Sequence, residues 1–135
     1  MKVLIPVDGS DCARDMLHWA AETLDKKNTQ YYLLSVVADP LIAEYEIRDA
    51  NRYLTQGRTF LEAYGCHVKD AVYIQGDPAQ SICDYADEMN VDQILIGSHG
   101  RGGIAKALLG SVSSQVMQCS DKPVFVYRGP QRKAS

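Results

Sequence analysis

The amino-acid sequence predicts a single α/β domain, an open parallel sheet of five strands with helices on both faces. Segments typical of strands and of helices alternate along all 135 residues, which is the arrangement of βαβ units. The strand-like segments are unbroken apolar runs, as expected for parallel strands covered on both faces. The length matches one domain, and no repeat, linker or low-complexity segment divides the chain.

The first half of the chain contributes two strands and two helices. Residues 2–7, KVLIPV, form an apolar run of strand length, and Ser10 can cap the helix that follows. Residues 31–37, YYLLSVV, predict a second buried strand, which ends before Asp39 and Pro40. A second helical stripe ends at Gly65. The apolar positions of the two helices are Ala13, Leu17, Ala20, Ala21 and Leu24, and then Tyr53, Leu54, Gly57, Phe60, Leu61 and Tyr64.

The second half repeats this alternation. Residues 67–75 predict a third strand, and Asp77 followed by Pro78 is typical of the N-cap and first position of a helix. The buried face of that helix holds Ile82, Tyr85, Ala86 and Met89. Residues 92–97, DQILIG, predict the fourth strand, and a helix over about residues 111–119 precedes the fifth, KPVFVY at 122–127.

The stretch after the fourth strand has the composition of a ligand loop. Residues 97–111, GSHGRGGIAKALLGS, hold five glycines before a helical pattern resumes. Glycine lets the backbone approach an anion closely, and the start of a helix offers free N–H groups and a positive dipole end. In an open parallel sheet, ligands bind beyond the carboxyl ends of the strands, where the winding reverses. If the first and fourth strands are neighbours, this loop and PVDGS at residues 6–10 converge on one phosphate-binding crevice.

Three other motifs fit this sequence poorly. The P-loop pattern is absent, because no glycine precedes Lys-Ser or Lys-Thr. Residues 100–105, GRGGIA, match a dinucleotide fingerprint, but they follow the fourth strand and no acid lies about 20 residues later. A phospho-accepting receiver domain needs several acids at strand ends, and only Asp8 qualifies, since the third strand ends in Gln75.

The spacing Gly97-x2-Gly100-x9-Gly110-Ser111 resembles the nucleotide-binding signature of the universal stress protein family. The opening KVLIPVDGS and the final third, from GSHGRGG to KPVFVYR, are also similar to that family. The likeness covers nearly the whole chain and is least distinctive over residues 41–64. It implies a Rossmann-like sheet of the adenine nucleotide alpha-hydrolase type with strand order 3-2-1-4-5, which makes strands one and four neighbours. Because members with the full signature bind ATP, the resemblance implies an ATP-binding protein.

The resemblance also implies a set of binding residues. Pro6, Val7 and Asp8 would border the adenosine, with Asp8 on the base or ribose, and Val36 would meet the adenine through backbone groups. Ile96 and Gly97 would contact the sugar side. The phosphates would lie against Gly100, Gly110, Ser111 and Val112, with Ser113 or Ser114 as further donors. Separately from the resemblance, Arg101 and Lys106 could neighbour the phosphates, although solvated loop and helix positions explain these two residues equally well.

Each of the main polar candidates also has a simpler interpretation. Asp8 before Gly-Ser can close an Asx turn, and Ser111 can serve only as a helix cap. His99 has no carboxylate or nucleophile near it in the sequence, which favours a loop position near phosphate over general-base chemistry. We expect no catalytic residue and no direct metal ligand.

The function expected from these features is an ATP-binding regulatory protein of the stress response. The ligand would be ATP, or ADP or AMP, with Mg²⁺ or Mn²⁺ as an optional companion. A slow metal-dependent ATPase or phosphate-transferring enzyme is the alternative, with Asp8 holding a metal through water and Arg101 supplying charge. A third interpretation is an adaptor with a vestigial pocket.

The fifth strand predicts an interface between two copies of the chain. From Pro123 to Tyr127 it reads PVFVY, and an apolar strand at the edge of a sheet invites pairing with another chain. A homodimer joined along this strand covers the edge, and the family resemblance implies the same.

Charge and composition argue against nucleic acid and membranes as partners and favour a cytoplasmic location. The net charge of −3 gives no general attraction to nucleic acid, and no apolar run has membrane-spanning length. The N-terminal apolar run is too short for a signal peptide, so we expect a cytoplasmic protein. Residues 1–129 would form the nucleotide-binding domain and 130–135 a solvated basic tail. The four cysteines have no metal-ligand spacing and are interpreted as small buried hydrophobes, with redox or metal chemistry as the less favoured alternative.

Overall fold

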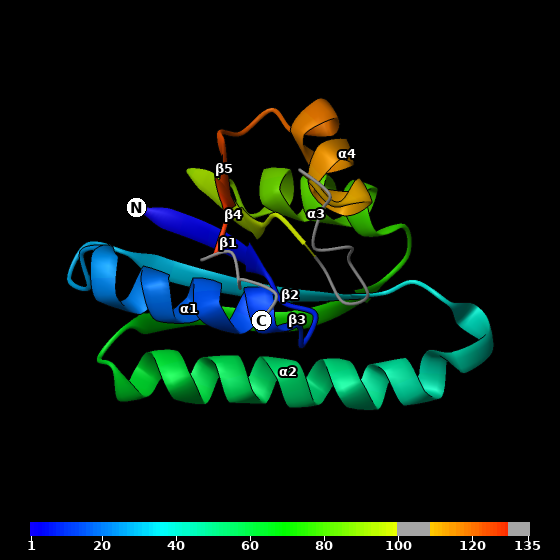
Figure 1. The fold of residues 1–135 in the computed structure, drawn as a ribbon, viewed down its shortest axis with the longest axis horizontal. Helices are drawn as coiled ribbons and strands as arrows, with labels where there is room; N and C mark the ends of the chain where they lie inside the picture. Colours follow the sequence, from blue (N-terminus) through cyan, green and yellow to red (C-terminus); the bar gives the residue numbers. More distant parts are fainter. Residues whose placement is uncertain (100–108, 130–135) are drawn as a thin grey trace, which may run out of the picture.

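The computed structural model describes residues 1–99 and 109–129 of the chain. Strands and helices alternate through these residues as the sequence predicts (Figure 1). The strands are β1 (Lys2–Pro6), β2 (Gln30–Val37), β3 (His67–Gln75), β4 (Gln93–Gly97) and β5 (Val124–Tyr127). The helices are α1 (Asp11–Thr23), the 3-10 turn η1 (Pro40–Ile42), α2 (Ala43–Ala63), α3 (Pro78–Glu88) and α4 (Ser111–Cys119).

The five strands form one parallel sheet in the order β3-β2-β1-β4-β5. This confirms the fold class and the neighbouring placement of the first and fourth strands. The chain winds from β1 outward to β3 and then returns to the other side of β1 at β4. The switch point, where ligands bind in such sheets, therefore lies between β1 and β4.

Helices cover both faces of the sheet (Figure 1). Val3, Ile5 and Val7 belong to the apolar cluster under α1 and α2, whereas Leu4 between them belongs to the cluster under α3 and α4. This alternation follows from the two-residue period of a strand. Because both faces are covered, the strands read as continuous apolar runs in the sequence.

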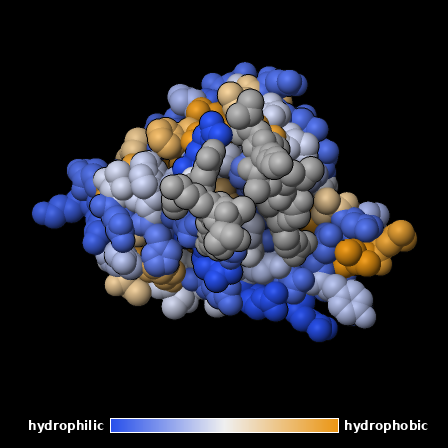
Figure 2. All heavy atoms as spheres, in the orientation of Figure 1, coloured by the Kyte–Doolittle hydropathy of each residue, from blue (hydrophilic) through white to orange (hydrophobic). Residues whose placement is uncertain are grey.

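Two details differ from the sequence prediction, the start of α2 and the length of β5. Helix α2 begins at Ala43, ten residues before the stripe that predicted it, and Ala43, Ile47 and Ala50 continue that stripe toward the N-terminus at helical spacing. Leu41, Ile42 and Tyr45 remain exposed there, and Figure 2 shows this apolar patch at the end of the molecule where Figure 1 places η1. β5 is shorter than predicted. No helix among the described residues is long and apolar enough to cross a membrane.

The cysteines correct a further prediction. Cys83 and Cys119 form a disulfide between α3 and α4, with their Cα atoms 6.4 Å apart. Cys12 and Cys66 are free thiols, of which Cys66 is buried. The paired residues are 36 positions apart in the chain, and only the packing of two helices brings them together. The sequence therefore carried no spacing signal for the pair.

Candidate functional site

A crevice opens at the switch point because β1 and β4 separate there. The two strands pair only at Val3 with Gln93 and Leu4 with Ile94, although both continue beyond these residues. The N–H of Val7 points to β2, where it donates to the carbonyl of Leu34 at 2.8 Å. Neighbouring residues of a strand direct their backbone groups to opposite sides, so the position of Pro6 faces β4. Proline has no N–H to donate, and the β1–β4 ladder cannot continue through it.

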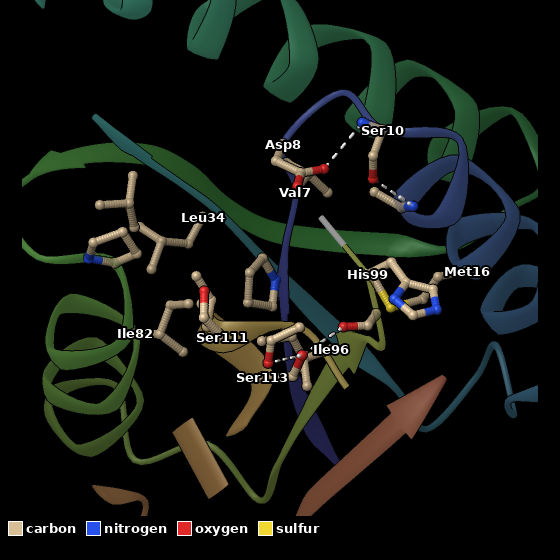
Figure 3. Close-up of a pocket in the computed structure, with 17 residues that line it drawn as sticks. Val7, Asp8, Ser10, Met16, Leu34, Ile82, Ile96, His99, Ser111 and Ser113 are labelled. Carbon is tan, nitrogen blue, oxygen red and sulfur yellow. Dashed lines mark hydrogen bonds between the residues drawn. The ribbon is translucent and has the colours of Figure 1, made fainter. Parts of the chain in front are cut away.

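The crevice holds a pocket of about 390 Å³, within the size range of small-molecule sites. Of the predicted site residues that the structure describes, all but the alternative donor Ser114 line it. Gly100, Arg101 and Lys106 lie outside the described residues. Figure 3 shows Leu34 and Ile82 toward one end of the pocket and His99 and Met16 toward the other. The lining residues are Pro6, Val7, Asp8, Ser10, Ala13, Met16, Leu34, Val36, Pro78, Ile82, Ile96, Gly97, His99, Gly110, Ser111, Val112 and Ser113.

The wall built on β1 and α1 has polar groups that bond to one another. An oxygen of Asp8 accepts the Ser10 N–H at 2.9 Å, and Ser10 Oγ accepts the Ala13 N–H at 3.1 Å and caps α1 (Figure 3). Gly9 between them has φ of +78°, which glycine adopts without strain. Asp8 therefore closes an Asx turn and also lines the pocket. The two interpretations of this residue are compatible.

The wall built on β4 and α4 has an open helix start. The N-cap of α4 is Gly110, and no side chain in the described part of the chain caps the helix. Gly110 sits close to the strand end, since its N–H donates to the Ser98 carbonyl, and an added Cβ would lie 3.1 Å from the Ser98 oxygen. The first residues of α4 line the pocket, and an anion there would satisfy N–H groups that no side chain of residues 1–99 and 109–129 caps.

Ser113 and Ser111 have different surroundings on this helix. Ser113 is 3% exposed, and its Oγ lies 3.2 Å from the Gly97 carbonyl oxygen and 3.4 Å from those of Ser98 and Gly110. One hydroxyl proton serves one of these oxygens, so the Ser113 side chain holds α4 to the end of β4 (Figure 3). Ser111 is exposed and lines the pocket mouth.

His99 has a buried polar atom without a hydrogen-bond partner among residues 1–99 and 109–129. Its Nδ1 is buried and forms no hydrogen bond within the described residues, although the residue lines the pocket. A buried polar atom without a partner costs free energy of about 1–3 kcal/mol. A ligand that bonds to Nδ1 would recover this cost.

The apolar end of the pocket exposes the backbone of β2. Leu34 accepts from β1, so Val36, two residues further on, directs its N–H and carbonyl to the same side. β1 ends at Pro6, and within the described residues no backbone hydrogen bond joins β2 to this side beyond Val7 to Leu34. A flat ring with a donor and an acceptor on one edge can bond to these groups while it packs on Ile82, Pro78 and Val112.

The sequence prediction missed several lining residues. Four apolar residues of the predicted helices and strands also line the pocket: Met16, Leu34, Pro78 and Ile82. Their apolar character is explained equally well by the core, so nothing in the sequence separated the two roles. His99 was placed near phosphate only as a loop residue. Its position within the glycine stretch was the one available signal.

The fold and this pocket define an α/β protein with a ligand site at the switch point of a parallel sheet, suited to a phosphate-bearing ring compound. The model of the universal stress protein family matches residues 1–128. The chain belongs to the universal stress protein family.

Two relatives from Methanocaldococcus jannaschii show the extent of the likeness. Universal stress protein MJ0531 is 26% identical over 98% of this chain and 84% of its own. Universal stress protein MJ0577 is 33% identical over 84% of this chain and 75% of its own. The solved structure of MJ0577 superimposes with a TM-score of 0.83 at 32% identity, covering 99% of this chain and 97% of that one.

Solved structures with the same fold include complexes with adenine nucleotides. The universal stress protein of Archaeoglobus fulgidus in complex with dAMP has a TM-score of 0.75 at 24% identity, over 93% of this chain and 96% of its own. Another universal stress protein was solved with cAMP, and a family member from Arabidopsis thaliana with AMP. Structural neighbours of this chain thus bind AMP, dAMP and cAMP.

Proposed function

We propose that this chain is an adenine-nucleotide-binding regulatory protein and that ATP is a ligand of the pocket between β1 and β4. The observation that carries the proposal is that, within the part of the chain that the structure describes, the start of α4 has no side-chain cap and Nδ1 of His99 has no hydrogen-bond partner. Both features lie in one pocket whose other end is apolar. The adenine nucleotides held by structural neighbours support the same ligand class.

Each part of the pocket suits one part of the nucleotide. The adenine ring would lie between β2 and α3, with the Val36 backbone on its hydrogen-bonding edge and Ile82 against its face. Asp8 would accept from the ribose or base, next to Ile96 and Gly97. The phosphates would take the N–H groups at Gly110–Val112, the hydroxyl of Ser111 and, if it carries its proton there, Nδ1 of His99. Gly100 and Arg101 remain proposed phosphate contacts from the sequence signature.

A metal ion has less support from this chain. Among residues 1–99 and 109–129, no group of three His, Cys, Asp or Glu side chains is placed to hold one. We therefore assign no metal ligand and derive no hydrolytic step. A companion Mg²⁺ or Mn²⁺ would rest mainly on the phosphate oxygens.

Calorimetric titration tests the proposal. Protein stripped of bound nucleotide by unfolding and refolding is titrated with ATP, ADP and AMP, with GTP as the control for base recognition. We expect saturable heats with the adenine nucleotides and a rise in Tm with each, because a ligand that binds the folded state stabilises it. The absence of heat and of a Tm shift with all three adenine nucleotides would reject the function.

We also propose a homodimer along β5. This strand is at the edge of the sheet, and Phe125 is 47% exposed while it stacks on Trp19 with ring centroids 5.3 Å apart. A second copy would cover these rings and the unpaired backbone edge. Sedimentation velocity should show a dimer at micromolar concentration, and Phe125→Lys should shift it to monomer. Lys at Tyr73, a similarly exposed aromatic on β3, is the matched control.

A cytoplasmic location, a lack of nucleic-acid partners and the solvated tail at 130–135 stay predictions. The tail lies outside the described residues. Cell fractionation and a nucleic-acid filter-binding assay test the first two. Deletion of residues 130–135 should leave nucleotide affinity unchanged if the domain ends at residue 129.

A further inference from the structure

The disulfide between Cys83 and Cys119 joins the two helices of one pocket wall. Cys83 lies in the middle of α3 and Cys119 is the last residue of α4. The first turns of the same helices line the pocket, through Pro78 and Ile82 on α3 and through Ser111–Ser113 on α4. A covalent bond at this place therefore acts on the geometry of the pocket from outside it.

Each sulfur of the pair lies near a backbone carbonyl of the opposite helix. Cys83 Sγ is 3.8 Å from the carbonyl oxygen of Val116 on α4, and Cys119 Sγ is 3.7 Å from that of Ala79 on α3. A disulfide sulfur has no proton to donate, so these are contacts and not hydrogen bonds while the disulfide is closed. A thiol formed by reduction would have an acceptor close by on the opposite helix.

The two sulfurs differ in their access to solvent. Cys83 is 3% exposed, whereas Cys119 is an exposed residue at the end of its helix. A reagent in solution reaches Cys119 first, and Cys83 can then react only with the sulfur beside it. This arrangement of one accessible and one buried sulfur is suited to reversible exchange.

We propose that Cys83 and Cys119 form a reversible thiol–disulfide site for low-molecular-weight disulfides, and that closing it raises the nucleotide affinity of the adjacent pocket. The Cys119 thiolate attacks one sulfur of the small disulfide, whose S–S bond breaks to release one thiolate. The Cys83 thiolate then attacks Sγ of Cys119 and displaces the second. The protein loses two protons and two electrons, and one small disulfide is reduced to two thiols.

The coupling to the pocket follows from the weak anchoring of α4 and rests on the proposed nucleotide function. The buried residues of this nine-residue helix are Ser113 and Val116. The crosslink is at its last residue, ~12 Å along the axis from Ser111. It removes tilts of α4 that would misplace the N–H groups at Gly110–Val112, and a wall held in its binding position binds more tightly. By reciprocity, bound nucleotide favours the disulfide by the same factor.

The first experiment tests the thiol chemistry without nucleotide. The protein is equilibrated in glutathione buffers of varied oxidised-to-reduced ratio, alkylated under denaturing conditions and weighed by intact mass spectrometry. We expect a reversible transition between four and two alkylated cysteines, and in Cys66→Ala a transition between three and one at the same buffer ratio. Cys83→Ser should stop at a mixed disulfide on Cys119. Failure to form the internal disulfide, or a disulfide that no buffer ratio reduces in the folded protein, would overturn the site.

The second experiment measures the coupling in the oxidised and reduced proteins. We expect ATP to bind about 3- to 10-fold more tightly to the disulfide form, and Cys83→Ser and Cys119→Ser to match the reduced protein in both buffers. Hydrogen exchange is measured in parallel on the nucleotide-free protein. The amides of α4 should exchange more slowly when oxidised, while those of α1 stay the same.

The outcomes separate the two proposals. Equal ATP affinity and equal α4 exchange in the two forms would overturn the coupling. If neither form binds an adenine nucleotide, the proposed function fails, and the effect of the crosslink on α4 is decided by the exchange measurement alone.

Discussion

The two walls of the pocket differ in how the free N–H groups at the start of their helices are satisfied. Each begins at the end of a strand, turns through a glycine and enters a helix. On the β1 side, Asp8 accepts the Ser10 N–H and Ser10 caps α1. On the β4 side, Gly110 leaves α4 without a side-chain cap, and Nδ1 of His99 has no partner within the described residues.

This difference indicates that the α1 wall contributes mainly to folding stability and the α4 wall mainly to ligand binding. The α1 wall is complete without a ligand, and it is anchored by Met16, Ala20 and Ala21 in the core and by the Tyr31 hydroxyl, which donates to the Ala20 carbonyl at 3.3 Å. In the described part of the chain, no side chain caps the first N–H groups of α4, and the helix has few buried residues. Changes to the first wall should therefore act mainly on folding, and changes to the second mainly on ligand affinity.

The largest effect should come from giving α4 the cap it lacks. Gly110 has φ of −72° and ψ of 163°, which any residue adopts, so Gly110→Asp can cap the helix with its carboxylate. That carboxylate would occupy the N–H groups and repel phosphate. We expect ATP affinity to fall about 300-fold, equivalent to about 3.4 kcal/mol, measured by calorimetry.

Gly110→Ala is the matched control for this variant. It adds the same Cβ, 3.1 Å from the Ser98 oxygen, without the charge, and should lose only severalfold. If both variants weaken ATP binding equally, the effect comes from crowding of the added Cβ against the Ser98 oxygen and not from the uncapped start of α4. The proposed difference between the two walls would then be wrong.

Alkaline pH should weaken the α1 wall. Burial raises the pKa of Tyr31 to about 12, with a smaller contribution from the charge of Cys66. The folded state holds this proton more tightly than the unfolded state, so its stabilisation is complete below pH 10 and is lost as the pH rises through 12. Two pKa units correspond to about 2–3 kcal/mol of unfolding free energy.

Tyr31→Phe isolates this contribution in urea unfolding at a series of pH values. The variant should be less stable than the wild type below pH 10, and the difference between the two proteins should shrink or reverse by pH 12. Tyr73→Phe, at an aromatic that is 40% exposed, should follow the wild type throughout. A difference that stays constant with pH would show that Tyr31 does not hold α1 in this way.

Removal of the cap of α1 should cost stability and spare the ligand. Ser10→Ala deletes the oxygen that accepts the Ala13 N–H, which is worth about 1 kcal/mol of unfolding free energy. Because Ser10 serves its own helix, ATP affinity should change by less than about twofold. Thermal and urea unfolding measure the first effect and calorimetry the second. A large loss of affinity with no loss of stability would reverse the roles assigned to the two walls.

The smallest effect should come from the exposed serine of α4. Ser111→Ala removes one hydroxyl at the pocket mouth and no helix cap, since the N-cap is Gly110. ATP affinity should fall about threefold, in the range of one modest hydrogen bond, and the urea midpoint should not change. A drop of the midpoint comparable to that of Ser10→Ala would show that Ser111 stabilises α4 directly.

The sequence predicted the parts of the site with distinctive local chemistry. The loop residues Asp8, Gly97, Gly110 and Ser111 were identified because turns, glycines and helix starts have residue preferences that do not depend on the rest of the fold. Pro6 was predicted as part of the PVDGS loop and, through the family resemblance, as a border of the adenosine. Its effect on the β1–β4 ladder appeared once the direction of its neighbours' hydrogen bonds was known.

The sequence could not predict the features that depend on which side chains meet. Three such features join distant segments: the Cys83–Cys119 pair, the apolar end of the pocket at Leu34 and Ile82, and the close approach at Gly97. A Cβ on Gly97 would lie 3.0 Å from Cys12 Sγ, tight enough that the Cys12 side chain would have to move. Composition is also ambiguous here, because a buried apolar residue serves a core and a pocket wall equally well.

By itself, then, the sequence determined the order of strands and helices, the two covered faces of the sheet and which loops line the pocket. These depend on periodicity, chain direction and backbone preferences, all of which are local. Only the tertiary structure decided where β1 and β4 part, which helix start remains open and which cysteines meet. These depend on distances between segments that packing brings together.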